Sequence, residues 1–387
     1  MKPGDDDVVL KLVHTADWHL GMKFGGFSDE AAKKLKRARI DVLDNIFGEA
    51  DRQGADAVLC AGDLFDTPDP DQVWWKALAD KLNALPWSGV RKVFLLPGNH
   101  DPLLAKSVWA PDHPFRQALP AFVQVVDRPN FEAPLGDGAV LYAEPCGSLS
   151  SSQDPTHAIP HREPGDERIR VGMVHGMTFD MPDHVANFPV EKDAAQHRGL
   201  DYLALGDTHG FKNVASQGMP PMVYPSAPEP TKFGERDAGN IAVVLIKRSR
   251  KVRLEKVPVA TWKWRRETID GLDGLRRLAE ENLKSTALDL TVTGFYTPDS
   301  YREAEGLLEA MKGNEASDGA VGAFRCDVTG MHLDPRNIEE VFAEQPEEIQ
   351  LAARALKKKA DQDTGAEAEV AERALLELCR LVREQVR

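Results

Sequence analysis

The chain has 387 residues, which is more than one ordinary domain needs and is enough for one large and one small domain. Its 48 basic and 62 acidic residues give a formal net charge of −14 at pH 7, which argues against a protein that coats nucleic acid through bulk charge. A local basic groove stays compatible with this total, because contact with phosphate depends on the binding face. No apolar run approaches the roughly 20 residues that a membrane-spanning helix needs.

The cysteines Cys60, Cys146, Cys326 and Cys379 are scattered and form no C-x-x-C pair. This spacing favours free thiols in a reducing compartment over a disulfide framework. The N-terminal stretch Met1 to Asp7 is acidic and lacks the apolar core of a secretion signal. We therefore expect a cytoplasmic protein.

The first 258 residues alternate between short apolar runs and longer amphipathic stretches. Continuous apolar runs are typical of strands in a sheet that is covered on both faces. The pattern predicts helices at 29–52 and 71–85 and a surface loop at 145–168. It predicts strands at 8–14, 57–61, 93–96, 121–126, 139–143, 169–174, 202–205, 240–246 and 247–256, the last two as a hairpin.

Three basic stretches are candidates for contact with nucleic acid. The early turns of the first predicted helix carry Lys33, Lys34, Lys36, Arg37 and Arg39. This cluster is interpreted either as a solvated helix face or as a contact with a phosphate backbone. The others are the basic run 247–256 and the segment 262–266, where two tryptophans alternate with basic residues. The alternative for those tryptophans is packing at a domain junction.

The composition changes near Val259, where we expect a second, smaller α/β domain. The pattern there predicts a helix at 272–284, a strand at 287–295, a helix at 299–312 and a strand at 320–329. Two amphipathic helices follow at 337–359 and 366–386. The apolar stripe of the last helix is expected to pack on its own chain or to dock to a partner. The predicted domains are 1–258, 259–334 and 335–387.

Polar residues follow the predicted strands at the point where each strand ends. Because the carboxyl ends of parallel strands meet at one rim, these side chains are expected to lie together. Carboxylate, amide oxygen and imidazole suit Mn²⁺, Fe or Zn²⁺ better than a thiolate site would. The set is too large for one ion and fits two ions about 3.5–4 Å apart that share a carboxylate. Its members are Asp17, His19, Asp63, Asn99, His100, His175, Asp207 and His209.

The order of these motifs, D-x-H, G-D-x-x-D, G-N-H-D, G-x-x-H and a final G-x-x-H, resembles the calcineurin-like metallophosphoesterase superfamily. The amino-acid sequences of residues 14–21, 62–66 and 97–101 resemble more narrowly those of the SbcD-type DNA repair exonucleases. The resemblance covers residues 8–246 well and 262–329 more loosely. It implies an α/β fold: a two-sheet α/β sandwich flanked by helices, with a smaller α/β capping domain before the C-terminal helices.

The resemblance also implies roles for individual residues. Asp17, His19 and His209 would hold the first ion, and Asp63 would bridge the two ions. The second ion would be held by Asn99, His175 and Asp207. His100 would protonate the leaving oxygen, while Asp101 would orient His100 or only cap its turn. Family members usually cut DNA with Mn²⁺ and work as homodimers beside an ABC-type, SbcC-like ATPase.

One residue departs from the usual motif, because Asp207 stands where the family usually has His. Asp remains a competent ligand, but its negative charge makes the ligand set of the second ion harder, which favours Mn²⁺ or Mg²⁺ over Zn²⁺. Three functions stay open from the sequence. The first is a metal-dependent DNA nuclease in repair or end processing. The others are a phosphodiesterase or phosphomonoesterase for small molecules and a non-catalytic interaction subunit.

Overall fold

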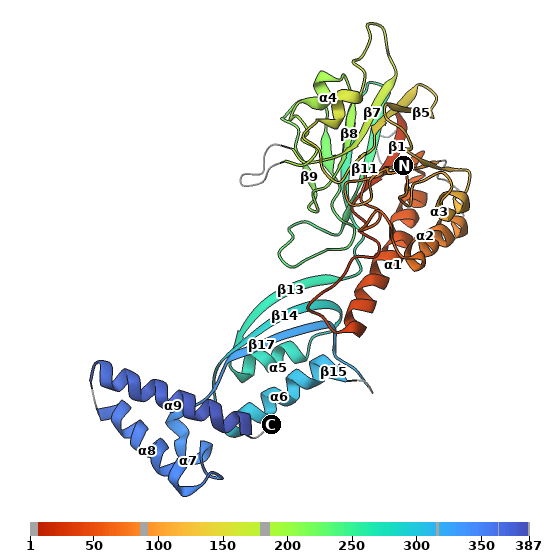
Figure 1. Ribbon diagram of the computed structural model, residues 1–387. Coiled ribbons are helices and arrows are strands. Elements are labelled where there is room, and N and C mark those ends of the chain that lie inside the picture. The colour runs from red at the N-terminus through yellow and green to blue at the C-terminus, as the bar shows by residue number, and fades with distance from the viewer. Residues whose placement is uncertain (1–6, 86–91, 179–185, 315–316, 363, 386–387) are drawn as a thin grey trace. The chain divides into compact units, whose positions relative to one another are not determined.

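Figure 1 shows the computed structural model of the chain, which describes residues 7–85, 92–178, 186–314, 317–362 and 364–385. Most of the acidic N-terminal stretch, and the predicted last residue of the final helix, Val386, lie outside the described residues. The chain forms two compact units. The first consists of Met1–Gly25 with Ala32–Trp262, and the second consists of Gly26–Ala31 with Lys263–Arg387.

The first unit contains two six-stranded sheets. In the first sheet, β1 to β4 lie side by side as parallel strands, and β11 pairs antiparallel with β1. The predicted hairpin is confirmed as β11–β12, although β12 begins later than expected because 248–251 form the turn. The strands are Val8–Thr15 (β1), Ala57–Cys60 (β2), Lys92–Leu95 (β3), Val123–Val125 (β4), Asn240–Lys247 (β11) and Val252–Pro258 (β12).

The second sheet has the strand order β5-β6-β7-β8-β10-β9, with β6, β7, β8 and β10 parallel. The sequence pattern does not predict β5, an edge strand in which buried and exposed residues alternate. Pro134 and Gly136 in this strand are residues that normally mark turns. The strands are Phe131–Gly136 (β5), Ala139–Glu144 (β6), Ile169–His175 (β7), Tyr202–Gly206 (β8), Lys212–Asn213 (β9) and Met222–Tyr224 (β10).

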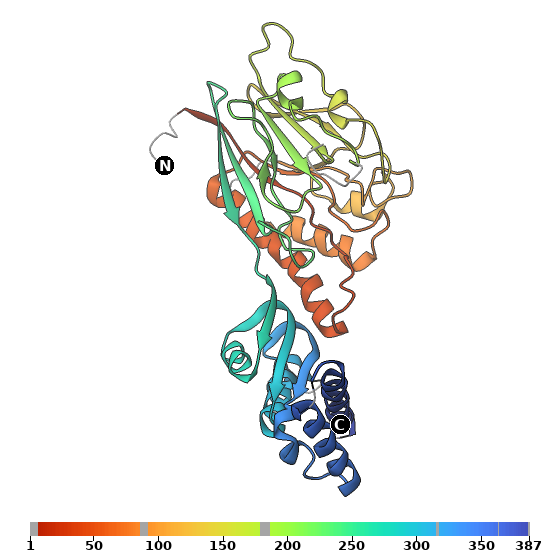
Figure 2. The same ribbon diagram turned by 90° about the vertical axis from the view of Figure 1, so that its left-hand side faces the viewer.

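An apolar core between the two sheets holds them together. Alternation along β1 sends Leu10 and Leu12 into this core and Val13 to the opposite face, where the helices pack. Each buried leucine contributes about 1.5–3 kcal/mol relative to an exposed one. Figure 2 shows helix α1 along the first sheet. The helices of this unit are Asp29–Gln53 (α1), Gln72–Ala84 (α2), Pro114–Ala118 (α3) and Ala194–His197 (α4), with a 3₁₀ turn at Pro155–Ala158.

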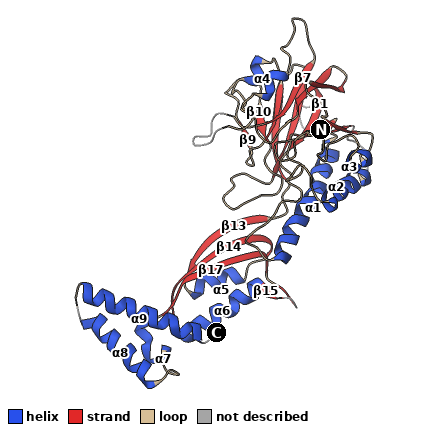
Figure 3. Ribbon diagram, in the orientation of Figure 1, coloured by secondary structure: helices blue, strands red, loops and turns tan. Residues whose placement is uncertain are grey.

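The second unit is built on a parallel sheet of β13, β14 and β17 (Figure 3). Helices α5 and α6 connect these strands and pack on the sheet through a shared apolar core. The helix predicted at 272–284 is wrong at its end, because Leu283 pairs with Val321 of β17 and already belongs to a strand. The elements are Lys263–Asp270 (β13), Leu272–Ala279 (α5), Leu283–Tyr296 (β14), Pro298–Lys312 (α6), Gly313–Asn314 (β15), Ser317–Asp318 (β16) and Val321–Leu333 (β17).

The C-terminal helices pack against this sheet and share its core. The predicted helix 337–359 is wrong as one element, because residues 342–346 are non-helical and separate α7 from α8. Pro346 precedes α8, and its missing N–H suits a helix start. In the predicted apolar stripe, Leu375 and Val382 are buried in the unit's own core, whereas Val370 is exposed. The elements are Pro335–Asn337 (3₁₀), Ile338–Val341 (α7), Glu347–Gln362 (α8) and Ala366–Gln385 (α9).

The division into three domains at 258 and 334 stays a prediction. Among the described residues, no helix combines the length and the apolar character that crossing a bilayer would require.

Candidate metal centre

The predicted site residues lie at the carboxyl ends of strands in both sheets. β1, β2 and β3 of the first sheet lead to Asp17, Asp63 and Asn99, and β7 and β8 of the second lead to His175 and Asp207. The expectation of a single sheet rim is therefore corrected, because two rims meet here. The imidazole Nδ1 of His175 lies 2.8 Å from the carbonyl oxygen of Ala61, which joins the sheets directly.

Several candidate ligands have a positive φ angle, a backbone conformation that residues other than glycine rarely adopt. The φ angles are 57° at Asp17, 44° at His19, 54° at Asp63 and 105° at Asp207. Such residues cost of order 1–3 kcal/mol each and persist only where the surrounding structure fixes them. The tight turns also require glycine, since a Cβ on Gly98 would lie 2.1 Å from Oδ1 of Asp63. This concentration of strain is typical of a functional site.

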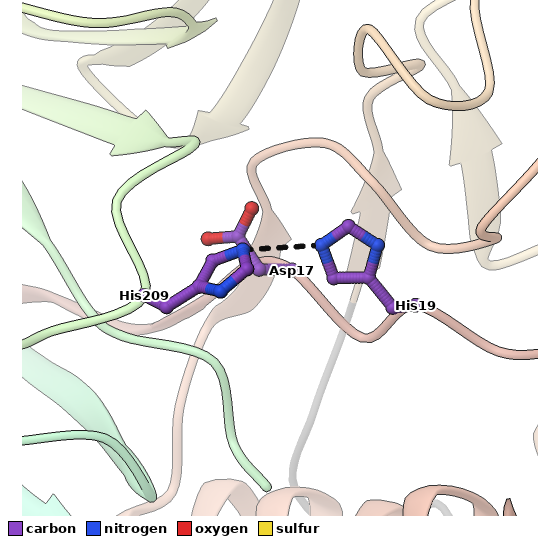
Figure 4. A group of neighbouring side chains, drawn as sticks. All are labelled: Asp17, His19 and His209. Atoms are coloured by element: carbon purple, nitrogen blue, oxygen red, sulfur yellow. Dashed lines mark hydrogen bonds between the residues drawn. The ribbon is translucent and has the colours of Figure 1, made fainter. Parts of the chain in front are cut away.

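The first predicted ligand set is brought together by the fold. Asp17, His19 and His209 each offer a donor atom, and these atoms lie within 4.8 Å of one another. Figure 4 shows the imidazoles of His19 and His209 pointing toward each other, with their Nε2 atoms 3.2 Å apart. The other ring nitrogen of His209 lies 2.8 Å from Oε1 of Glu235. A carboxylate behind a histidine is the arrangement that orients metal-binding imidazoles in other proteins.

Asp63 lies between the first set and the second. Its Oδ2 is 3.4 Å from Nε2 of His175 and 3.8 Å from Nε2 of His19. Oδ1 of Asn99 lies 2.8 Å from Nε2 of His175, and Oδ1 of Asp207 lies 4.0 Å from the same atom. The fold therefore gathers all seven predicted ligands, with Asp63 in the position expected of a shared one.

The charges of these buried groups shift one another's pKa values. Burial disfavours the protonated form of His175, but Asp63, Asp17 and Asp207 together outweigh it and raise its pKa to about 10. Burial raises the pKa of Asp207 to about 6, and the carboxylates of Asp17 and Asp63 add to the rise. Neighbouring carboxylates in a low-dielectric site are stabilised by cations. The donor set, with its three aspartates, three histidines and one asparagine, thus fits hard or borderline divalent ions.

The two predicted catalytic residues differ sharply in their surroundings. The side chain of His100 is 46% exposed, and its ring meets that of His19 edge-on at 4.8 Å between centroids. Asp101 is fully buried, and its two oxygens accept the backbone N–H groups of Gly98 and Phe65. These bonds correspond to the turn-capping alternative, so we treat Asp101 as a positioning residue and keep only His100 as the candidate catalytic one.

The structure adds four residues that the sequence analysis does not assign to the site. Asp66 has Oδ1 3.2 Å from Nδ1 of His19 and 3.8 Å from Nδ1 of His100. Thr231 and Glu235 both lie beside Nδ1 of His209. Asp66 ends the G-D-x-x-D motif and could have been found there, whereas Thr231 and Glu235 follow no motif.

Arg39 is the fourth added residue, and it corrects an interpretation of the basic cluster on the first helix. It is only 2% exposed and belongs neither to a solvated face nor to a phosphate contact. Burial lowers the pKa of its guanidinium to about 10, against the opposing effect of Glu229 and other nearby carboxylates. At neutral pH the buried side chain therefore still carries its charge.

Comparison with known proteins agrees with this geometry. A family model described as calcineurin-like phosphoesterase matches residues 10–211. The uncharacterized metallophosphoesterase YhaO of Bacillus subtilis is 26% identical over 226 residues, 56% of this chain and 52% of that protein. The SbcD subunit of the nuclease SbcCD from Bacillus subtilis is 36% identical over 92 residues, 24% of this chain and 22% of that protein. The SbcD subunit from Rhodobacter capsulatus is 34% identical over 112 residues, 28% of this chain and 25% of that protein.

These matches thus span about half of YhaO and about a quarter of each SbcD protein. Among solved structures, a dimetal phosphatase from Danio rerio aligns over 65% of this chain and 100% of its own. Its sequence is 12% identical to this chain, and the TM-score is 0.39.

The family match covers slightly more than half of the 387 residues and includes every site residue predicted from the sequence. The resemblance stated from the motifs and the predicted mixed α/β fold are confirmed. The chain belongs to the calcineurin-like phosphoesterase family, whose members use a dinuclear metal site.

Proposed function

We propose that this phosphoesterase is a metal-dependent DNA nuclease that hydrolyses phosphodiester bonds during DNA repair or end processing. The observation that carries the proposal is the likeness to the SbcD subunit of the SbcCD nuclease. The gathering of two ligand sets around Asp63, beside the half-exposed His100, supports phosphodiester chemistry at this rim.

In this proposal, Asp17, His19 and His209 hold one divalent ion and Asp63 is shared. The second ion is held by the three remaining ligands, Asn99, His175 and Asp207. When bound, such ions lower the pKa of water and polarise phosphoryl oxygens. The extra carboxylate of Asp207 favours Mn²⁺, with Mg²⁺, Fe or Zn²⁺ as alternatives.

The side chains around the ions have separate tasks. The exposed imidazole of His100 protonates the leaving oxygen. The edge-on contact between the rings of His100 and His19 places this imidazole beside the first ligand set. Asp66 orients His100, since its backbone oxygen lies 3.4 Å from the Nδ1 of that ring. Asp101 keeps the loop that carries His100 in place through its two backbone hydrogen bonds.

The partners in this proposal are DNA, an ABC-type SbcC-like ATPase and a second copy of the chain. The likeness to the SbcD proteins supports the first two. The homodimer rests on the resemblance of the motifs alone.

A smaller phosphodiester is a second candidate substrate, because the predicted DNA-binding stretches are compensated locally. In the run 247–256, Lys247 pairs with Asp7 and Lys256 pairs with Asp237. In the segment 262–266, Arg265 pairs with Glu281. These acids reduce the positive potential that a phosphate backbone would meet.

The test is hydrolysis of end-labelled duplex and single-stranded DNA with Mn²⁺, with Mg²⁺ and without metal. The His100→Ala variant is expected to lower the rate of cutting by about 10²–10⁴-fold, the usual contribution of a general acid. His157→Ala is the matched control, because this imidazole is also exposed but lies in the 3₁₀ turn Pro155–Ala158, beside Glu191. Intact DNA under all conditions, with bis-p-nitrophenyl phosphate still hydrolysed, would favour the smaller substrate.

A further inference from the structure

The buried Arg39 of α1 joins two separate stretches of backbone. Its Nε donates to the carbonyl of Trp18 at 2.7 Å, and its Nη2 donates to that of Asp17 at 3.3 Å. Its Nη1 donates to the carbonyls of Glu229 and Pro230 at 3.2 and 3.1 Å. One rigid guanidinium thus connects the turn that presents Asp17 to the loop at 229–230.

The side chain of Glu229 continues this connection. It is 2% exposed, and its carboxylate accepts the backbone N–H of Thr261 at 2.7 Å and the hydroxyl of Thr261 at 2.6 Å. The N–H of Trp262 donates to the other oxygen at 3.3 Å. Trp262 is the last residue of the first unit, so Glu229 anchors the segment where the chain leaves that unit.

The same loop also contacts His209 of the first ligand set. Oγ1 of Thr231 and Oε1 of Glu235 lie 3.0 and 2.8 Å from Nδ1 of His209. The backbone N–H of Thr231 donates to Oε2 of Glu235 at 2.8 Å. Residues 229–235 therefore contact the Asp17 turn through Arg39, contact His209 directly, and hold the segment at Thr261 through Glu229.

We propose that Arg39 and Glu229 are positioning residues that couple the Thr261–Trp262 segment to the Asp17 turn, so that the first ligand set binds its ion more tightly when this segment is anchored. The inference rests on the metal centre of the proposed function and adds to it a route of regulation. Asp17 and His19 both adopt left-handed backbone conformations, which must be held from outside the turn. Loosening the 229–230 loop removes two of the acceptors of Arg39, and the Asp17 turn relaxes.

The first test is the affinity of the full-length chain for Mn²⁺, measured by calorimetry with no substrate present. Arg39→Lys keeps the charge but cannot reach both backbone stretches, and we expect affinity at the first site to fall about tenfold. Arg170→Lys is the matched control, since Arg170 is also buried and donates to the backbone carbonyls of Pro160 and His161. It is expected to lower the melting temperature without changing Mn²⁺ affinity.

A second variant changes the exposed Thr261 and is gentler on the fold. Thr261→Val removes one hydrogen bond to Glu229, and we expect Mn²⁺ affinity to fall by about two- to fivefold, as for the loss of one hydrogen bond. Thr156→Val is its control, because the buried hydroxyl of Thr156 likewise donates to a carboxylate, that of Asp154. We expect the Arg39→Lys/Thr261→Val double variant to lose less affinity than the product of the two single losses, because both act along one route.

Losses in the double variant that multiply fully would overturn the coupling. So would an affinity for Mn²⁺ in Arg39→Lys or Thr261→Val no lower than in its control, or a wild-type chain that binds no Mn²⁺. A wild-type chain that binds Mn²⁺ but cuts no DNA refutes the nuclease proposal alone, because the affinity measurements still decide the coupling.

Discussion

The carboxylate of Asp101 accepts the backbone N–H of Phe65, 36 positions earlier in the chain, at 3.0 Å. Its other oxygen accepts the N–H of Gly98 at 2.8 Å. One fully buried side chain therefore fixes the loop after β2 against the loop after β3. These two loops carry Asp63 and Asn99, so the spacing of these two proposed ligands depends on a side chain whose carboxylate bonds to backbone N–H groups.

Asp101→Asn should separate this positioning role from catalysis. An amide has only one acceptor oxygen, so one buried N–H loses its partner, at a cost of about 1–3 kcal/mol in the free energy of unfolding. We expect kcat to fall as well, because the two loops move. Asp154→Asn is the control, since Asp154 also accepts two backbone N–H groups but on a surface loop. A normal kcat in a destabilised Asp101→Asn protein would contradict the positioning role.

The proposed sharing of Asp63 by two ions predicts how metal affects the stability of the fold. Any ion that binds only the folded chain stabilises it, by about 2.7 kcal/mol at a concentration one hundred times the Kd. Mn²⁺ should therefore raise the melting temperature of the wild type, and a chelator should reverse the rise. Asp63→Asn should lose most of this response, because both ions lose a ligand. A response equal to that of the wild type would show that Asp63 is not shared.

Asp207 predicts a difference in metal preference from family members that have His at this position. Replacing a carboxylate with imidazole makes the second site softer and less negative. We expect Asp207→His to gain activity with Zn²⁺ relative to Mn²⁺, compared with the wild type under the same conditions. Asp207→Ala serves as the control for simple loss of a ligand. If the ratio of Zn²⁺ to Mn²⁺ activity is the same in all three proteins, Asp207 does not set the preference.

His14 predicts a loss of stability in acid. It is fully buried beside the hydroxyl of Tyr202, and burial lowers its pKa from 6.5 to about 3. The unfolded chain takes up this proton near pH 6.5 and the folded chain does not, so the stabilisation is complete above pH 6.5. It falls as the pH drops toward 3, by at most about 1.4 kcal/mol per pH unit from this group.

The measurement is urea unfolding of the wild type and of His14→Gln at pH 7.5 and pH 5.5. Glutamine does not titrate and can still bond to the hydroxyl of Tyr202. Other titrating groups contribute equally to both proteins, so the wild type should lose more stability than the variant over this interval. Equal losses would mean that His14 is protonated in the folded state or accessible to water.

Much of the site could be read from the sequence because its chemistry resides in short local motifs. Asp17 and His19 share one turn, and Asp207 and His209 share another, so residue type and spacing alone predict metal ligands. Apolar runs such as 57–61, which precedes Asp63, predict strands because a strand that is covered on both faces is apolar along its whole length. The helix at 29–52 was likewise predictable from its apolar spacing.

The remaining features depend on contacts between residues far apart in the chain. The packing of the two sheets brings His175 to Ala61. Contacts between distant loops bury the charge of Arg39 and turn Asp101 into a link between the loops after β2 and β3. The end of α5 is decided by the pairing of Leu283 with Val321 and not by local helix preference. Local patterns thus determined which atoms this protein offers to an ion, and tertiary packing alone decided which of them meet, because burial and pairing energies exceed local conformational preferences.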